Sequence, residues 1–133
     1  MEIDWCWYSK ELKIIFDTSF LMAIASKPIK KLELLEDLNA EYIVLSAVIH
    51  ELEMLKNSKQ IKRAKAARAA LDIINSMNIK VINAKGKPID DLIIDYAIAN
   101  NAYVATIDGE MKRRLREEGI GIITLSRDKI IFE

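Results

Sequence analysis

The chain has 133 residues, of which 51% are hydrophobic and 30% charged, and its 20 basic and 20 acidic side chains leave no net charge. This length and balance fit one globular domain with a sizeable core and exclude a disordered chain. No apolar run approaches the roughly 18 residues that a membrane span requires.

The N-terminus and the cysteine content indicate the compartment. The first five residues lack a basic segment and an apolar segment, so we expect no secretory signal. The single cysteine, Cys6, cannot form an internal disulfide. Together these features predict a reduced, cytoplasmic setting. A zero net charge argues against indiscriminate binding to nucleic acid, but an acidic metal site with basic rims is compatible with it.

The first half of the chain alternates short β-rich runs with amphipathic stretches. A strand over residues 13–16 ends at Asp17, and a helix over 20–25 follows it, entered through Thr18 or Ser19 as the N-cap. Pro28 opens a second helix. Three more elements are predicted before residue 78: a strand over 42–45, a helix over 47–56, and a helix over 60–77 with Ala64, Ala67, Leu71 and Ile74 on its inner face.

The second half continues the alternation. The predicted elements are a strand over 79–82, a helix over 88–100, a strand over 103–106, a helix over 109–118, a strand over 122–125, and a tail over 129–132 that can add an antiparallel edge. Alternating strands and helices predict a three-layer α/β/α sandwich around a mainly parallel five-stranded sheet. No linker divides residues 13–133, which we expect to form one domain, preceded by an extension over residues 1–12 to which we assign no role.

Two acids follow predicted strands directly. Ligands of open parallel sheets bind beyond the carboxyl ends of the strands, and Asp17 and Asp108 lie there. For Asp17 a capping role at the start of the next helix explains its position equally well.

Helical geometry selects two further acids. Glu51 borders the apolar stripe of its helix, whereas Glu53 points almost opposite, so Glu51 is expected near the protein interior. Asp90 falls at the margin of an apolar face, while Asp91 and Asp95 lie on the outer side and are expected to be solvated. Acids in a first helical turn also complement the helix dipole, which is the structural explanation for Asp90 and Asp91.

Four carboxylates at one edge would repel each other unless a cation lies among them. Oxygen ligands without histidine or cysteine favour Mg²⁺ or Mn²⁺ over zinc, and His50 is expected on the outer side of its helix. Such a site suits phosphodiester hydrolysis. A receiver domain is disfavoured because no acid follows the third strand, and a P-loop NTPase because its glycine-rich loop is absent.

Four stretches of the chain, in order, resemble the motifs of PIN-domain nucleases. They are Ile14–Leu21 with Asp17, Val48–Glu53 with Glu51, Ile89–Ala97 with Asp90, and Ala105–Asp108 with Asp108. The resemblance implies a PIN-type sandwich and a metal-dependent endoribonuclease in which these four acids coordinate the metal. It also implies that Ser19 and Thr106 support the acids, although either hydroxyl could simply cap a helix. Asp91 matches a frequently acidic position and becomes a candidate supporting residue.

Basic residues follow two of these motifs. We expect some of Lys62, Lys65, Arg113 and Arg114 to contact RNA phosphates, although a solvated helix face is the simpler explanation for any one of them. The acidic pattern and the basic helices resemble the ribosomal-RNA-processing branch more than the VapC-type toxin branch. A catalytically silent scaffold in an RNA-processing complex is the non-enzymatic alternative. The resemblance also implies a homodimer, with an antitoxin or an RNA-processing complex as partner.

Overall fold

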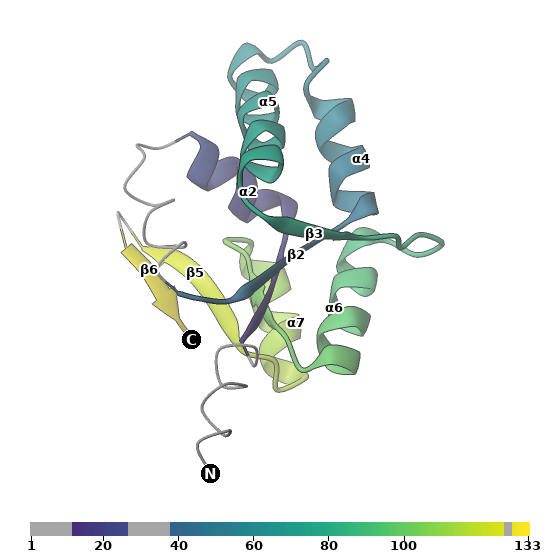
Figure 1. The fold of residues 1–133 in the computed structure, drawn as a ribbon, viewed down its shortest axis with the longest axis vertical. Helices are drawn as coiled ribbons and strands as arrows, with labels where there is room; N and C mark the ends of the chain where they lie inside the picture. The colour runs from purple at the N-terminus through teal and green to yellow at the C-terminus, as the bar shows by residue number, and fades with distance from the viewer. Residues whose placement is uncertain (1–11, 27–37, 127–128) are drawn as a thin grey trace.

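The structure, a computed structural model, describes residues 12–26, 38–126 and 129–133 (Figure 1). The helix predicted to begin at Pro28, and the predicted N-terminal extension apart from Leu12, lie outside the described residues. None of the helices in the described ranges is long and apolar enough to cross a membrane.

A sheet with the strand order β3-β2-β1-β4-β5-β6 forms the centre of the described part. Its strands are β1 (Lys13–Phe16), β2 (Glu41–Leu45), β3 (Ile79–Ile82), β4 (Tyr103–Ala105), β5 (Ile122–Ser126) and β6 (Lys129–Phe132). The first five are parallel, and β6 pairs antiparallel with β5. The predicted mainly parallel sheet is confirmed, and the C-terminal tail makes the sixth strand.

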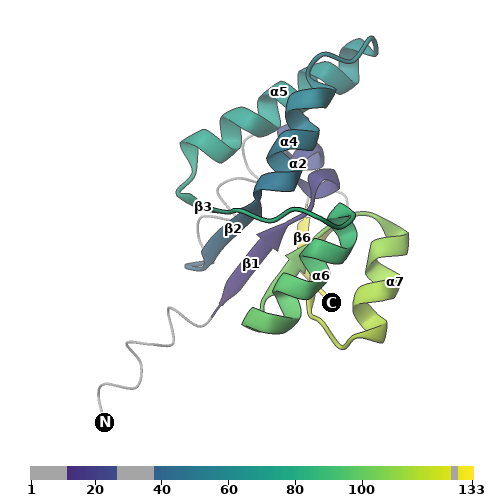
Figure 2. The same ribbon diagram turned by 90° about the vertical axis from the view of Figure 1, so that its right-hand side faces the viewer.

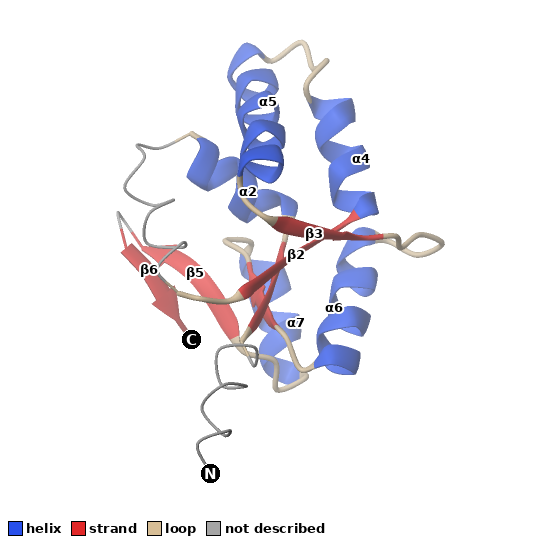
Figure 3. Cartoon of the chain, viewed as in Figure 1, coloured by secondary structure: helices blue, strands red, loops and turns tan. Residues whose placement is uncertain are grey.

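Helices cover both faces of this sheet. They are α2 (Thr18–Ala25), α4 (Ser46–Leu55), α5 (Ile61–Ser76), α6 (Ile89–Asn100) and α7 (Gly109–Glu117). Helix α5 packs against α2 and α4, and these three helices lie across the sheet from α6 and α7 (Figures 2 and 3). Small buried residues on α5, Ala64, Ala67 and Ala70, allow its close approach to α2 and α4.

The covering of both faces explains the residues of the central strands. Ile14, Ile15 and Phe16 are consecutive in β1 and none of them is exposed, as expected for a parallel strand that is buried on both faces. The Phe16 ring stacks on Phe20 of α2 and Tyr42 of β2, with ring centroids 5.8 and 5.7 Å apart. Burial of these large side chains fixes β1 in the middle of the core.

Strands β1 and β4 form the topological switch point of the sheet. The chain steps outward from β1 through β2 to β3 on one side, and from β4 to β5 on the other. The Asp17 N–H donates to the Ala105 carbonyl at 2.9 Å, which carries the pairing to the carboxyl ends of both strands. Residues that follow β1 and β4 therefore meet at this edge, where ligands of such sheets bind.

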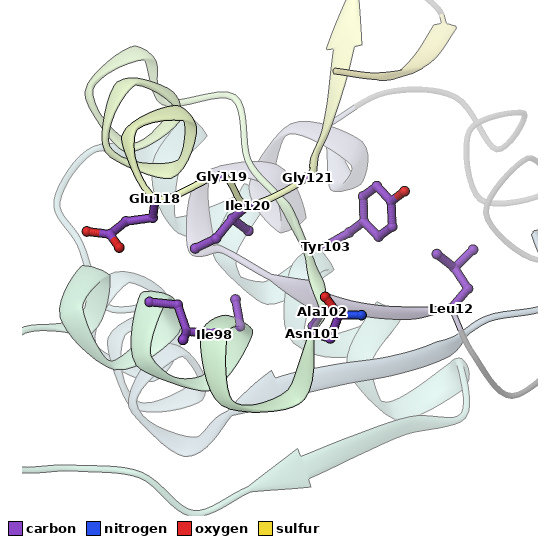
Figure 4. A pocket seen from close by; sticks show the side chains of 10 residues that line it. Leu12, Ile98, Asn101, Ala102, Tyr103, Glu118, Gly119, Ile120 and Gly121 are labelled. Atoms are coloured by element: carbon purple, nitrogen blue, oxygen red, sulfur yellow. The ribbon is translucent and has the colours of Figure 1, made fainter.

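The opposite end of these strands contains a cavity of about 700 Å³ (Figure 4). Leu12 before β1, Tyr103 at the start of β4, and Gly121 before β5 line it. The Tyr103 ring meets Phe132 of β6 edge to face, with centroids 5.7 Å apart. A Cβ atom on Gly121 would lie 2.5 Å from this ring, so only glycine leaves room for it.

We expect Gly121→Ala to destabilise the protein by about 1–3 kcal/mol, because the added methyl group displaces Tyr103 from its packing. Gly109→Ala is the matched control, since nothing lies within 4 Å of its Cβ position at the start of α7. That change should be neutral or stabilise by a few tenths to about 1 kcal/mol. Urea unfolding of both variants measures the difference, and equal stabilities would contradict the packing argument.

Candidate active site

Asp17 lies immediately after β1 and is only 5% exposed. Its Oδ1 atom accepts a hydrogen bond from the Thr18 N–H at 2.8 Å. Its Oδ2 atom accepts from the Thr106 hydroxyl at 2.7 Å and from the Ser19 hydroxyl at 3.0 Å. The N-cap of α2 is therefore Asp17, which confirms the capping role considered for it, and the prediction of Thr18 or Ser19 as the cap was wrong. Both hydroxyls that were expected to support the acids contact this one.

The hydroxyls also join the two strand ends to each other. Ser19 Oγ and Thr106 Oγ1 are 3.2 Å apart, and Ser19 Oγ accepts from the Ile107 N–H at 3.2 Å. The Asp108 N–H donates to Thr106 Oγ1 at 3.1 Å. This network fixes Asp17, the N-cap of α2, relative to Asp108, the N-cap of α7.

Glu51 reaches the same place from α4. Its Oε1 atom accepts from the Thr18 hydroxyl at 2.6 Å, a contact that the sequence analysis missed. The residue is exposed and does not lie near the interior as expected, because Val48 and Leu52 form the buried face of α4 and Glu51 flanks it at the cleft. The only sequence signal for Thr18 is its place directly after Asp17, in the first turn of the helix.

All four predicted acids line one cleft of about 260 Å³. Asp90 is half-buried in the first turn of α6, and Asp108 caps α7 by accepting from the Glu110 N–H at 3.0 Å. The lining consists of Asp17, Thr18, Ser19, Met22, Glu51, Leu55, Arg63, Asp90 and Asp108. Four acids separated by up to 91 positions in the chain are thus brought to the carboxyl edge of the sheet.

Burial and mutual repulsion govern the charge of this cleft. Burial raises the pKa of Asp17, the hydroxyls of Thr106 and Ser19 lower it in part, and the charge of Asp90 raises it again. Burial also raises the pKa of Asp90; the negative charge of Asp108 adds to the rise, and the Arg114 guanidinium opposes it. The protein therefore holds these two carboxylates in a setting that disfavours their negative charge.

Asp95 is exposed, as expected, and Asp91 is partly exposed, but both are also ion-paired, which the sequence did not indicate. Asp91 receives a hydrogen bond from the Arg114 guanidinium at 2.6 Å, and Asp95 pairs with Lys87 at the same distance. The turn of α7 that carries Arg114 faces the first turn of α6, which a helix-by-helix reading of the sequence does not reveal. Asp91 thus contacts a cation that acts on Asp90, and the cleft lining does not include it.

One basic residue lines the cleft, and it was not among those predicted from the sequence. Arg63, at the start of α5, lines it, whereas Lys62 and Lys65 are exposed on the same helix outside the lining. Arg113 pairs with Glu110 and with Glu117, so its charge is partly compensated. His50 is exposed, as expected. The 100° step between helical residues makes neighbouring side chains diverge, and only the packing of α5 decided which one faces the acids.

Comparison with known proteins identifies the family. The profile of the PIN-like domain family matches residues 14–129. The chain belongs to this family. Ribonuclease VapC4 from Methanocaldococcus jannaschii is 31% identical over 125 residues, covering 91% of this chain and 95% of that relative. Ribonuclease VapC9 from Archaeoglobus fulgidus is 29% identical over 93 residues, covering 70% and 67%.

Solved structures share the PIN-like fold. The PIN domain endonuclease Utp24 has a TM-score of 0.73 and 27% identity, with 92% of each chain covered. A domain of a functionally unknown protein from Methanocaldococcus jannaschii has a TM-score of 0.63 at 23% identity, covering 89% of this chain and 94% of that one. The resemblance to PIN-domain nucleases is confirmed. The preference for the ribosomal-RNA-processing branch is not, since both sequence relatives are VapC ribonucleases.

The oxygen atoms in the cleft of this PIN-like chain are of the kind that bind hard divalent cations. Carboxylate and hydroxyl oxygens line the cleft, and a cation would offset the repulsion that raises the pKa of Asp90. In the described ranges, however, no three acidic, histidine or cysteine side chains are arranged to hold an ion as they stand. Glu51 is engaged by Thr18, and Asp108 caps its own helix.

We expect Asp17→Asn to raise the melting temperature at pH 7 in the presence of a chelator. The pKa of Asp17 is raised in the folded state, so the unfolded chain releases this proton first and native stability falls as pH rises through the window above the ordinary value of 3.8. Asparagine carries no charge and avoids that loss. The advantage should therefore shrink as pH is lowered towards 4.

Differential scanning calorimetry between pH 4 and pH 8 measures this dependence. Asp72→Asn, at an exposed position of α5, serves as the control for removal of a negative charge. The assigned direction of the Asp17 pKa shift would be contradicted if the native protein had the higher melting temperature at pH 7. The same holds if its advantage over Asp17→Asn increased with pH.

Proposed function

We propose that this protein is a metal-dependent endoribonuclease in which Asp17, Glu51, Asp90 and Asp108 bind Mg²⁺ or Mn²⁺. The observation that carries the proposal is that these four acids, each from a different element, line one cleft at the carboxyl edge of the sheet. Membership of the PIN-like family and the ribonuclease relatives support the same reaction class. PIN-domain nucleases generally depend on a divalent metal.

A bound divalent ion supplies a nucleophilic hydroxide from water and stabilises charge on the attacking and leaving oxygens. The protein supplies a rigid carboxylate for it, since Thr18, Ser19 and Thr106 fix both oxygens of Asp17. Thr18 also turns the Glu51 carboxylate towards the cleft. The fixed placement of Asp17 reduces reorganisation when a ligand binds, whereas Glu51 and Asp108 have to leave their present partners to reach an ion.

Substrate binding requires positive charge beside an acidic cleft. We assign the first phosphate contact to Arg63, which lines the cleft, and assign Arg114 the role of moderating the charge of Asp90 while paired with Asp91. The sequence-based proposal for Lys62, Lys65 and Arg113 then concerns the outer path of the RNA, because these side chains do not line the cleft.

Two biological settings accord with this chemistry. The fold and 27% identity shared with Utp24 support RNA processing, the branch that the sequence favours. The coverage of 95% of Ribonuclease VapC4 at 31% identity supports the toxin branch, with an antitoxin as partner. A ribosomal-RNA maturation defect on deletion favours the first setting, and an antitoxin gene immediately upstream favours the second. In both settings we propose a cytoplasmic enzyme, acting on RNA as a homodimer.

We expect Asp17→Asn to reduce RNA cleavage by about 100-fold or more, because the carboxylate fixed at the strand end is lost as a ligand. Cleavage of a labelled RNA is measured with Mn²⁺, with Mg²⁺ and with a chelator, using Asp72→Asn as the matched control. Thermal shifts are measured in parallel, since an ion that binds only the folded protein raises its stability by about 2.7 kcal/mol at a hundredfold excess over Kd. If neither metal stimulates RNA cleavage by the native protein, the enzyme proposal is wrong and the catalytically silent scaffold is the better explanation.

We expect Arg63→Gln to weaken RNA binding and to reduce the slope of log affinity against log salt by about one phosphate contact. Lys65→Gln is the comparison variant on the same helix, since Lys65 does not line the cleft, and it should lower the slope by less than Arg63→Gln does. Fluorescence anisotropy at several salt concentrations measures both. A reduced slope for Lys65→Gln with an unchanged slope for Arg63→Gln would reverse the assignment.

A further inference from the structure

A second, apolar groove adjoins the acidic cleft. It has a volume of about 780 Å³ and lies between α4 and the loop that joins β3 to α6. Ala47, Met54 and Leu55 on α4 and Ile89 at the start of α6 provide apolar surface. Glu51 and Leu55 line both hollows, so the groove and the cleft are continuous.

The groove is held open by contacts at both ends of the loop. The Ala84 N–H donates to Ser46 Oγ at 3.0 Å, and that hydroxyl lies 3.2 Å from both the Ala84 carbonyl and Asn83 Oδ1. At the other end, Lys87 pairs with Asp95 of α6 at 2.6 Å. The groove is thus preformed, and a ligand that enters it does not have to order the loop first.

The groove carries fewer acids than the cleft. Lys85 and Lys87 line it beside one acid, Glu51, and Lys87 is paired with Asp95. Met54 exposes 66% of its surface there, so its side chain is open to a ligand. Apolar walls beside cations suit a ligand with a flat apolar part and a nearby negative charge.

We propose that this groove binds an unpaired nucleobase of the RNA, next to the phosphate that enters the acidic cleft. The inference rests on the proposed nuclease function and adds a base-binding subsite to it. A base splayed out of its stack offers its face to Met54, Leu55 and Ile89, while its phosphate lies near Lys85.

The test uses the full chain with Asp17→Asn in a chelator, so that binding is observed without cleavage. The probes are a hexamer of adenylate and a hexamer of abasic ribose phosphates. Methyl NMR of methionine and isoleucine reports Met54 and Ile89 in the groove. We expect the adenylate hexamer to shift both signals and the abasic hexamer to leave them unchanged.

A variant of the groove wall makes the test quantitative. Met54→Ser, at an exposed position, should weaken binding of the adenylate hexamer by about tenfold, in the range of one base contact. Ile98→Ser is the matched control, because Ile98 is 55% exposed on α6 beside the cavity at the other end of the sheet. Its affinity for the hexamer should equal that of the parent.

Three outcomes would overturn the inference: equal shifts with both hexamers, equal affinity of the Met54→Ser and Ile98→Ser variants, or groove signals that move only with protein concentration. The last result would identify a second copy of the chain as the occupant. The proposed nuclease function fails separately, when native protein with Mn²⁺ does not cleave RNA. Base-dependent shifts of Met54 and Ile89 support the groove assignment in that case too.

Discussion

The candidate site depends on the burial of one carboxylate between two parallel strands. Asp17 follows β1, is 5% exposed, and is held by hydroxyls from its own helix and from the end of β4. A buried charge is tolerated only when hydrogen bonds or a cation compensate it. The hydroxyls of Ser19 and Thr106 supply part of that compensation, and the pKa of Asp17 is still raised. The negative charge of Asp17 is therefore only partly compensated, and a divalent ion at this end of the sheet would compensate the rest.

The remaining groups of the site extend outward from Asp17. Thr18 connects the start of α2 to Glu51 on α4, and Thr106 connects the end of β4 to the Asp108 backbone. Across the sheet, Arg114 joins α7 to α6 through Asp91 and moderates Asp90. The acids therefore lie on helices from both faces of the sheet, and the core around Phe16 keeps those helices in place. Packing of the core therefore both stabilises the fold and places the acidic side chains.

In our proposal, the acidic cleft and the apolar groove divide the recognition of a nucleotide between them. The cleft offers oxygen ligands and Arg63, whereas the groove offers apolar walls with Lys85 and Lys87 at its margin. Glu51 belongs to both, so a shift of α4 would alter them together. The Ser46 contacts that tie the loop to α4 serve this shared geometry. The position of α4 would then determine the geometry of both the phosphate site and the base site.

The sequence by itself determined the order of the elements, the parallel sheet and the four acids at its edge, because strand and helix periodicity and strand-end position are local properties. The resemblance to PIN-domain nucleases added Ser19 and Thr106. Only the tertiary structure decided that Asp17 caps α2, that Thr18 binds Glu51, that Asp91 pairs with Arg114, and that Arg63 faces the cleft in place of Lys62 or Lys65. Each of these depends on how two elements distant in sequence are rotated against each other, and burial of the whole core sets that rotation.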